Sequence, residues 1–239
     1  GWGKAQPDAE LVFGPNIADW PEQIALPENL VLKVASAIYD PVTTTDELIP
    51  SGETSSYRSN PLKLSEFALS RKDPQYVPRA KAVQALEAGR RAGKLSDEAK
   101  ALLKEAGCGE KVTGIGSVVF ALKPGDGSAR EQAASCQRVL GGCANIAAEY
   151  ATKRYRSNVV NWGMLPFILD DAKNSGIRAG DVVVVRGIRK ALLDGKTDEI
   201  PAELISGGSR REITLSLPKL TADERDIILA GCLINYYAK

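Results

Sequence analysis

The middle of the chain alternates short apolar segments, typical of buried strands, with segments that space their apolar residues as a helix does. Residues 116–122 and 144–148 are predicted strands, and residues 128–140 between them are a predicted helix that ends at a pair of glycines. Parallel strands need a long crossover, usually a helix, so this order predicts parallel strands in one sheet. The pattern confines the chain to mixed α/β folds.

Further strands are predicted on either side of this unit. Residues 30–38 and the valine-rich residues 181–185 are predicted buried strands. Residues 202–205 and 212–217 flank a Ser-Gly-Gly-Ser turn and form a predicted hairpin, which precedes a C-terminal helix with a capping box at Thr221. The sequence therefore predicts a mixed, partly parallel sheet with an antiparallel annex.

Three segments depart from this pattern. Residues 1–29 contain four prolines and little periodicity, so we expect an N-terminal arm or linker there. Residues 43–60 are a predicted polar loop. Residues 78–107 have Ala, Leu, Lys and Glu at helical intervals, with Ser96 as the N-cap of a second helix. We expect one domain over residues 30–239 that carries residues 78–107 as a helical insert.

Composition excludes several classes of chemistry. The 239 residues include no His, which excludes a Ser-His-Asp triad, a Cys-His dyad, His-ligated zinc and a His base. The formal net charge of +1 gives no electrostatic reason to expect nucleic acid or a membrane surface as a partner. No apolar run reaches the ~20 residues of a membrane span. The four cysteines form no CxxC pair, so we expect reduced thiols in a cytoplasmic protein and no metal site in this chain.

The most informative segment is the glycine turn, residues 123–131, which lies between a predicted strand and a predicted helix. Ser128 followed by Glu131 fits a capping box, in which the serine only caps the helix. The same helix start fits an anion site, because its unpaired N–H groups and the guanidinium of Arg130 suit a carboxylate or a phosphate. There the alkoxide of Ser128 would be stabilised enough to take a proton from carbon. These residues alone leave both interpretations open.

Four motifs occur in an order that points to a known family. They are Thr-Thr-Asp-Glu-Leu-Ile-Pro-Ser-Gly at residues 44–52, Gly-Asp-Gly-Ser-Ala-Arg-Glu at 125–131, Leu-Gly-Gly at 140–142 and Gly-Met-Leu-Pro at 163–166. They resemble the C-terminal swivel domain of the aconitase superfamily, which typically has T-T-D-H-I-S-P-A-G, G-E/D-G-S-S-R-E, L-G-G and G-L-L-P. The resemblance covers about residues 30–235 and implies a swivelling β/β/α domain, similar to the small subunit of isopropylmalate isomerase.

The resemblance also implies a function. Aconitase-type hydro-lyases dehydrate and rehydrate a hydroxy polycarboxylic acid at a [4Fe-4S] cluster, which cysteines of other domains hold. Ser128 matches the family's serine base, Asp46 a supporting aspartate, and Arg130 and Arg58 the arginines that bind substrate carboxylates. Gly127 and Ala129 would line the substrate beside them. The partners implied are the N-terminal aconitase-type domains, in the same polypeptide or in a separate subunit.

Departures from the family pattern indicate a divergent hydratase branch. Ala129 stands where aconitase has a second serine, Glu47 where it has His, and Gln132 where His commonly follows the glutamate. The lost hydroxyl at Ala129 removes an expected substrate contact, so citrate and isocitrate need not be the substrates.

Two alternatives to an excised enzyme domain remain open. The chain could be a non-catalytic carboxylate-binding or regulatory module, or a natural small subunit of an isopropylmalate isomerase-like enzyme. We favour the excised domain, because the chain lacks an initiator Met and begins with a proline-rich arm. The isolated chain is then expected to be inactive and to contain no cluster.

Overall fold

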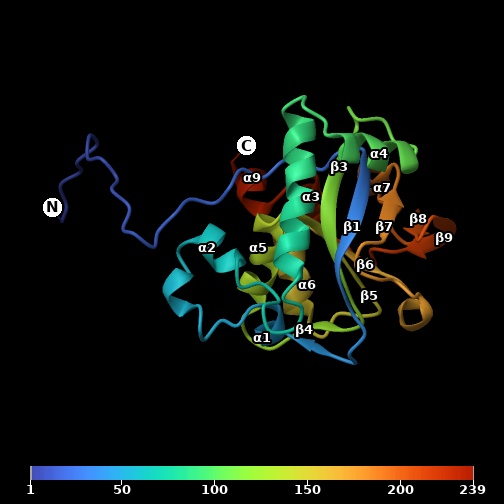
Figure 1. Cartoon of the computed structure of the whole chain (residues 1–239). Coiled ribbons are helices and arrows are strands. Elements are labelled where there is room, and N and C mark those ends of the chain that lie inside the picture. Colours follow the sequence, from blue (N-terminus) through green and yellow to red (C-terminus); the bar gives the residue numbers. More distant parts are fainter. Residues whose placement is uncertain (1, 239) are drawn as a thin grey trace.

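The computed structural model describes residues 2–238 and contains a mixed seven-stranded sheet (Figure 1). In spatial order its strands are β6 (Leu165–Ile168), β5 (Gly142–Ala147), β3 (Thr113–Ala121), β1 (Asn29–Ile38), β7 (Val182–Val185), β8 (Ile200–Ser206) and β9 (Ser209–Leu215). Neighbours from β6 to β1 are parallel, and neighbours from β1 to β9 are antiparallel. The predicted mixed α/β sheet, with a parallel core and an antiparallel annex, is confirmed.

Helices cover both faces of the sheet (Figure 1). They are α2 (Pro61–Ser65), α3 (Tyr76–Arg91), α4 (Asp97–Glu105), α5 (Arg130–Val139), α6 (Lys153–Asn161), α7 (Ile188–Asp194), α8 (Ala222–Ala230) and α9 (Leu233–Tyr237). Because side chains alternate along a strand, β3 contributes to two cores. Val118 and Phe120 pack in the core that holds α7 and α8, whereas Val119 and Ala121 pack in the core that holds α5.

The polar-loop prediction for residues 43–60 is wrong in part. The segment contains the strand β2 (Thr43–Thr44), the helix α1 (Thr45–Leu48) and the 3-10 turn η1 (Ser55–Tyr57). α1 forms because Thr44 and Glu47 make a reciprocal capping box and because Leu48 is fully buried. Helix caps were predicted better elsewhere, since Ser96 and Thr221 are the N-caps of α4 and α8.

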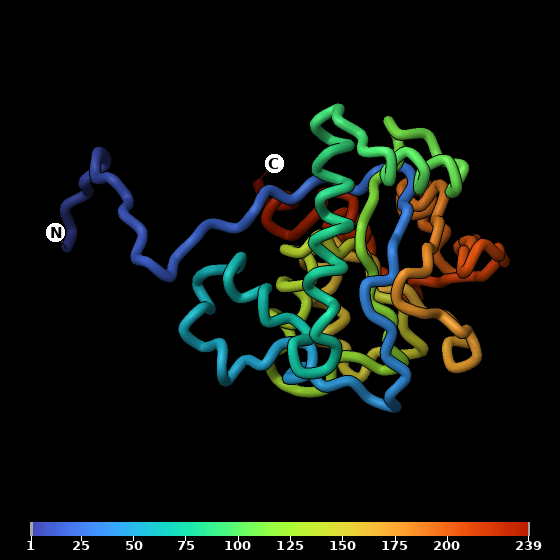
Figure 2. The backbone as a smooth tube through the Cα atoms, viewed as in Figure 1, coloured from blue at the N-terminus to red at the C-terminus, as the bar shows by residue number. Residues whose placement is uncertain are grey.

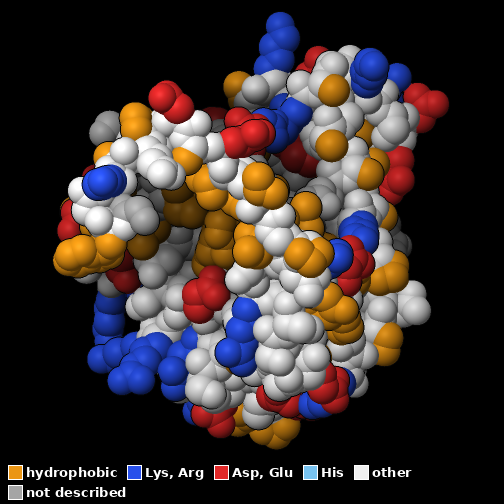
Figure 3. Space-filling model, turned by 90° about the vertical axis from the view of Figure 1, so that its left-hand side faces the viewer, with side chains coloured by type: hydrophobic (Ala, Val, Ile, Leu, Met, Phe, Trp, Pro, Cys, Tyr) orange, Lys and Arg blue, Asp and Glu red, His pale blue; other side chains and the backbone are white. Residues whose placement is uncertain are grey.

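The N-terminal arm contains no helix or strand over residues 2–28, and its first part extends away from the body (Figures 1 and 2). It contacts the body where Trp20 packs on Trp162, with ring centroids 4.3 Å apart, and where the Leu26 N–H donates to the Leu229 carbonyl. The side of the molecule that carries the arm and α2 is hollowed, and apolar side chains line the hollow (Figure 3).

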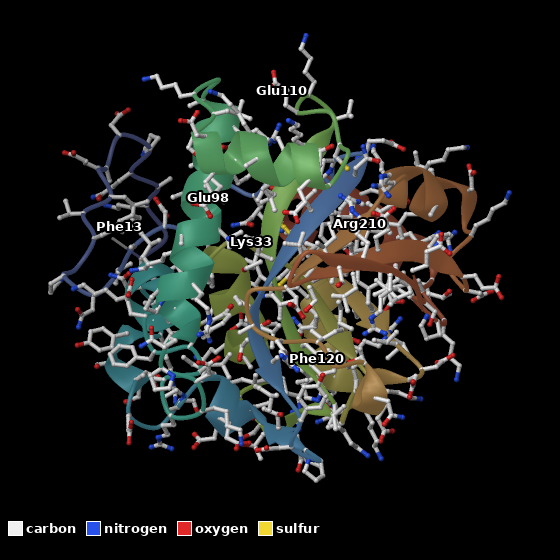
Figure 4. All side chains as sticks on the ribbon, turned by 45° about the vertical axis from the view of Figure 1, so that its right-hand side comes forward. Phe13, Lys33, Glu98, Glu110, Phe120 and Arg210 are labelled. Atoms are coloured by element: carbon white, nitrogen blue, oxygen red, sulfur yellow. The ribbon has the colours of Figure 1, made fainter. Side chains whose placement is uncertain are left out.

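Residues 78–107 lie mostly in α3 and α4, which complete the core on one face of the sheet. Val83 and Leu86 of α3 pack against Val31 of β1. Lys33 of β1 pairs with Glu98 of α4 at 3.1 Å, and Figure 4 shows these two side chains between the strand and the helix. Figure 4 also shows Phe13 on the arm, well away from this core.

Candidate functional site

A small two-stranded sheet joins the two motif segments of the sequence. β2 pairs in parallel with β4 (Pro124–Asp126), with Thr43 opposite Pro124 and Thr44 opposite Asp126. α1 follows β2 directly and packs on both β4 and α5. The motif that contains Asp46 therefore lies against the glycine turn, as the predicted site requires.

Two glycines shape the glycine turn. Gly125 has φ +97° and Gly127 has φ +129°, backbone conformations that other residues rarely adopt. A Cβ on Gly125 would collide with the ring of Tyr155, and one on Gly127 would collide with the hydroxyl of Thr45. The Gly125 carbonyl accepts a hydrogen bond from Thr152 Oγ1, the N-cap of α6, at 3.0 Å. The turn is thus held between α1 on one side and α6 on the other.

Ser128 does not cap the helix, so the predicted capping box with Glu131 is wrong. α5 begins at Arg130, and its N-cap is Ala129, which makes no side-chain cap hydrogen bond. The two left-handed glycines lengthen the turn and displace the helix start beyond Ser128. The Ser128 side chain is exposed, and its hydroxyl makes no hydrogen bond with the described residues. That hydroxyl is available for other chemistry.

Arg130 lies in the first turn of α5 with its side chain partly buried. Its Nε is buried and has no hydrogen-bond partner among the described residues. Glu131, the neighbouring carboxylate, accepts a hydrogen bond from Trp162 Nε1 at 3.1 Å and forms no ion pair with Arg130. A buried N–H without a partner costs about 1–3 kcal/mol, which a ligand carboxylate would offset.

Asp46 is exposed on α1, where its Oδ2 lies 2.7 Å from Arg71 Nη1. Glu47 stands where the family pattern has His, and its carboxylate forms hydrogen bonds with neighbouring residues. Its carboxylate accepts hydrogen bonds from the Thr44 N–H at 2.7 Å and from Lys72 Nζ at 3.0 Å. Glu47 therefore stabilises the start of α1.

Arg58 follows η1, is exposed, and forms no hydrogen bond or ion pair with the rest of residues 2–238. η1 packs on α2, and α2 packs on α5. Tyr57 stacks on Phe67 with ring centroids 5.6 Å apart, which anchors the loop that carries Arg58. The structure thus packs α1, which carries Asp46, against β4 and α5, and links the loop of Arg58 to α5 through α2.

Two groups that support this site were not predicted from sequence. Arg71 and Lys72 pair with the carboxylates of α1 from a distant segment. Behind the turn, Tyr155 donates to Asn145 Oδ1 at 2.7 Å and accepts from Gln137 Nε2 at 2.9 Å. Burial raises the pKa of Tyr155, so this hydroxyl remains a neutral structural group. Of these supporting groups, only the two adjacent basic residues at 71–72 could have been noticed in the sequence as a candidate feature.

The cysteines do not fit an iron–sulfur cluster. Cluster ligands must be thiolates, but burial raises the pKa of both Cys136 and Cys143. Cys232 instead accepts the Asn235 N–H as the N-cap of α9. Among residues 2–238, no three His, Cys, Asp or Glu side chains lie together so as to hold a metal ion. We therefore derive no step through a cluster from this chain.

A cavity lined by described residues lies away from the glycine turn. Its volume is about 640 Å³, and it is lined mainly by residues 21–27, α3 and the end of α5. None of Asp46, Arg58, Ser128 and Arg130 lines it. The chemistry-bearing residues lie instead on an open surface, which fits half of a site that is completed by other groups.

Residues 84–172 match the family described as the aconitase C-terminal domain. The match begins within α3 and includes the glycine turn, whereas Asp46 and Arg58 precede it. The resemblance stated from the motifs is therefore confirmed at the level of the family.

Particular relatives match a stretch of 117 residues, 48% of this chain. It is 34% identical to the putative mitochondrial aconitate hydratase of Emericella nidulans and 32% identical to that of Aspergillus fumigatus. The matched stretch spans 14% of the length of each of these proteins.

A solved structure is similar over nearly the whole chain. The crystal structure of a 3-isopropylmalate dehydratase from Methanocaldococcus jannaschii superposes with a TM-score of 0.53 at 22% identity, covering 87% of this chain and 93% of that one. This likeness shows the fold. In the part of the chain that the structure describes, no helix is long and apolar enough to cross a membrane.

Proposed function

We propose that this chain is the C-terminal domain of an aconitase-type hydro-lyase that acts on a hydroxy polycarboxylic acid. The parallel pairing of β2 with β4 carries the proposal, because it puts the segment of Asp46 against the turn of Ser128 and Arg130. Two motif segments that are far apart in the sequence then contribute to one surface. The family match over the glycine turn supports the same assignment.

Each residue has a chemical task in this proposal. The guanidinium of Arg130 binds one substrate carboxylate, and Arg58 binds a second. N–H groups around Gly127 and Ala129 stabilise the alkoxide of Ser128, which takes the proton from the substrate carbon and becomes a neutral hydroxyl. Asp46 supports the site from α1. Departure of the substrate hydroxyl needs groups outside this chain, which the family resemblance assigns to a [4Fe-4S] cluster in other domains.

The substrate contacts differ from those of aconitase. Ala129 has no hydroxyl to offer, and the Glu47 carboxylate is held by Thr44 and Lys72. A site with fewer polar contacts would discriminate less strongly among substrates that differ by one hydroxyl group. Citrate and isocitrate therefore need not be the natural substrates.

The proposed protein extends beyond this chain. We take residues 1–29 as the linker from preceding aconitase-type domains, residues 30–239 as the swivel domain, and residues 78–107 as an insert in it. The preceding domains are part of the same polypeptide or form a separate subunit. Four free thiols fit a reducing compartment. The fungal relatives are named mitochondrial, so we propose the cytoplasm or the mitochondrial matrix.

An NMR titration with citrate as the probe tests the carboxylate site. We expect the amide signals of Gly127 and Glu131 to shift, and Arg130→Lys to weaken binding by about 1.5–3 kcal/mol, because lysine keeps the charge but loses the bidentate geometry. Arg210→Lys is the control, because Arg210 pairs with Glu203 on the hairpin at the other edge of the sheet. Unshifted amides up to high millimolar citrate would refute the site.

The isolated chain should lack hydratase activity and bind no iron, because its thiols do not form a ligand set. Protein purified anaerobically should be colourless. Visible absorbance of an iron–sulfur centre that persists after gel filtration would contradict this expectation.

A further inference from the structure

Two consecutive basic residues each bridge two carboxylates at the short helix α1. Arg71 Nη1 lies 2.7 Å from Asp46 Oδ2, while its Nη2 bonds Glu53. Lys72 Nζ lies 3.0 Å from Glu47 Oε1 and also bonds Asp40. Both cations come from the segment between α2 and α3, outside every motif that suggested the site.

This segment is fixed at both ends. Leu69 is fully buried with φ +55°, a conformation that costs about 1–3 kcal/mol in a residue other than glycine. Its N–H donates to the Leu48 carbonyl at 2.9 Å, which ties it to the end of α1. At the other end, Asp73 accepts from Ser36 Oγ of β1 at 2.7 Å and pairs with Arg79 of α3. Arg71 therefore approaches α1 from a rigid support.

Asp46 lies close to the proposed carboxylate site. It follows Thr45, whose hydroxyl fills the space where Gly127 would carry a side chain. Asp46 is the next residue of α1, and α1 packs on both β4 and α5. An unpaired Asp46 carboxylate would therefore add negative charge to the surface that carries the glycine turn and would repel a polycarboxylate ligand.

We propose that Arg71 is a positioning residue of this site, which orients and neutralises Asp46 so that a polycarboxylate can approach the glycine turn. The proposal rests on the proposed function. Arg71 acts through Asp46 and is not itself a ligand of the substrate. Lys72 has the parallel role at Glu47, which explains how a glutamate is accommodated at that position.

Charge rescue tests this role. Citrate is titrated by NMR into the wild-type chain, Arg71→Ala, and the double variant Arg71→Ala with Asp46→Asn. We expect Arg71→Ala to raise the citrate Kd about threefold to tenfold through the exposed carboxylate charge. Asp46→Asn should restore the Kd of the double variant to within about twofold of wild type. Arg71→Lys should lie between wild type and Arg71→Ala.

The matched control is Lys81→Ala, because Lys81 pairs with Glu66 and has the same side-chain exposure as Arg71, 48%. Lys81→Ala should leave the citrate Kd unchanged. An Arg71→Ala chain that binds citrate as wild type does would overturn the proposal. So would a double variant that stays as weak as Arg71→Ala, since Arg71 would then bind the ligand itself or act only on the fold.

A second readout separates this proposal from the proposed function. If the wild-type protein binds no citrate, the proposed function fails. The amide NMR signals of α1 then show whether Arg71 orients that helix. Arg71→Ala should shift the amide signals of residues 45–48 and speed hydrogen exchange at Ile49, whose N–H bonds Thr45. Lys81→Ala should change neither quantity. Unchanged α1 amides in Arg71→Ala overturn the positioning role in that case.

Discussion

At the scale of single residues, the site is marked by polar atoms without partners. Within residues 2–238, four side-chain atoms are buried and make no hydrogen bond: Thr43 Oγ1, Tyr76 OH, Ser117 Oγ and Arg130 Nε. Thr43 begins β2, which pairs with β4, and Arg130 begins α5, so two of the four lie on elements that adjoin α1 at this junction. Folding leaves hydrogen-bonding capacity unused at this junction, and a polar ligand would use it.

Ser128→Ala tests whether the site is catalytic or only binds carboxylates. In the complete enzyme, loss of the base should lower kcat by about 10²–10⁴-fold, while the citrate Kd of the chain stays within about twofold of wild type. Ser135→Ala in the middle of α5 is the control for removal of a hydroxyl, since its Oγ bonds only the Gln132 carbonyl. Undiminished turnover in Ser128→Ala would favour the non-catalytic module.

At the scale of elements, two indole rings connect the N-terminal arm to α5. They are the side chains of Trp20, in the arm, and Trp162, the residue after α6. Trp162 follows α6, and its N–H holds Glu131 in the first turn of α5. Trp20 of the arm packs on the Trp162 ring, and the Ala18 N–H donates to the Ser59 carbonyl beside Arg58. The arm thus contacts the loop of Arg58 directly and is linked to the start of α5 through Trp162.

Trp162→Phe should weaken citrate binding about threefold, because phenylalanine keeps an aromatic ring but has no N–H for Glu131. The released carboxylate would then be an unpaired negative charge in the first turn of α5 and would repel citrate. Trp20→Phe is the control. Trp20 packs on Trp162 but, within residues 2–238, forms no hydrogen bond with Glu131. Citrate titrations of both variants measure the difference, and equal affinities would show that the indole N–H has no influence on Arg130.

The sequence predicted the helices and strands better than the tertiary contacts between them. The strands follow from local periodicity, and the helix caps at Ser96 and Thr221 follow from local hydrogen bonds. Both could therefore be predicted from a few neighbouring residues in the sequence. The helix start after Ser128 could not, because two left-handed glycines and the tertiary bond from Trp162 to Glu131 decide it. The pairing of Arg71 with Asp46 is likewise tertiary and has no local signature.

At the scale of the whole molecule, burial of weak acids makes the fold sensitive to alkali. Desolvation raises the pKa of Tyr76, Tyr150, Tyr155 and Cys136. In the unfolded chain such groups ionise near their ordinary pKa values, about 8.5 for Cys and about 10 for Tyr. Above those values the unfolded state binds fewer protons than the folded state, so the free energy of unfolding falls as pH rises.

Urea unfolding between pH 7 and 11 should therefore show constant stability up to about pH 8.5 and a decline above it. Each group that ionises only on unfolding contributes about 1.4 kcal/mol per pH unit to this slope. Cys136→Ala should reduce the decline between about pH 8.5 and 10, although the variant is less stable at neutral pH because it leaves a cavity. A free energy of unfolding that is constant to pH 11 would contradict the burial of these groups.

The small β2–β4 sheet has a consequence for the order of folding. β2 follows β1 and β4 follows β3, so the parallel pairing of β1 with β3 brings the two short strands together. Chain entropy opposes closure of the long loop between them until the contacts of β1 with β3 hold its ends. Citrate affinity would then return during refolding only after β1 and β3 have paired, and its return reports that the β2–β4 junction has closed.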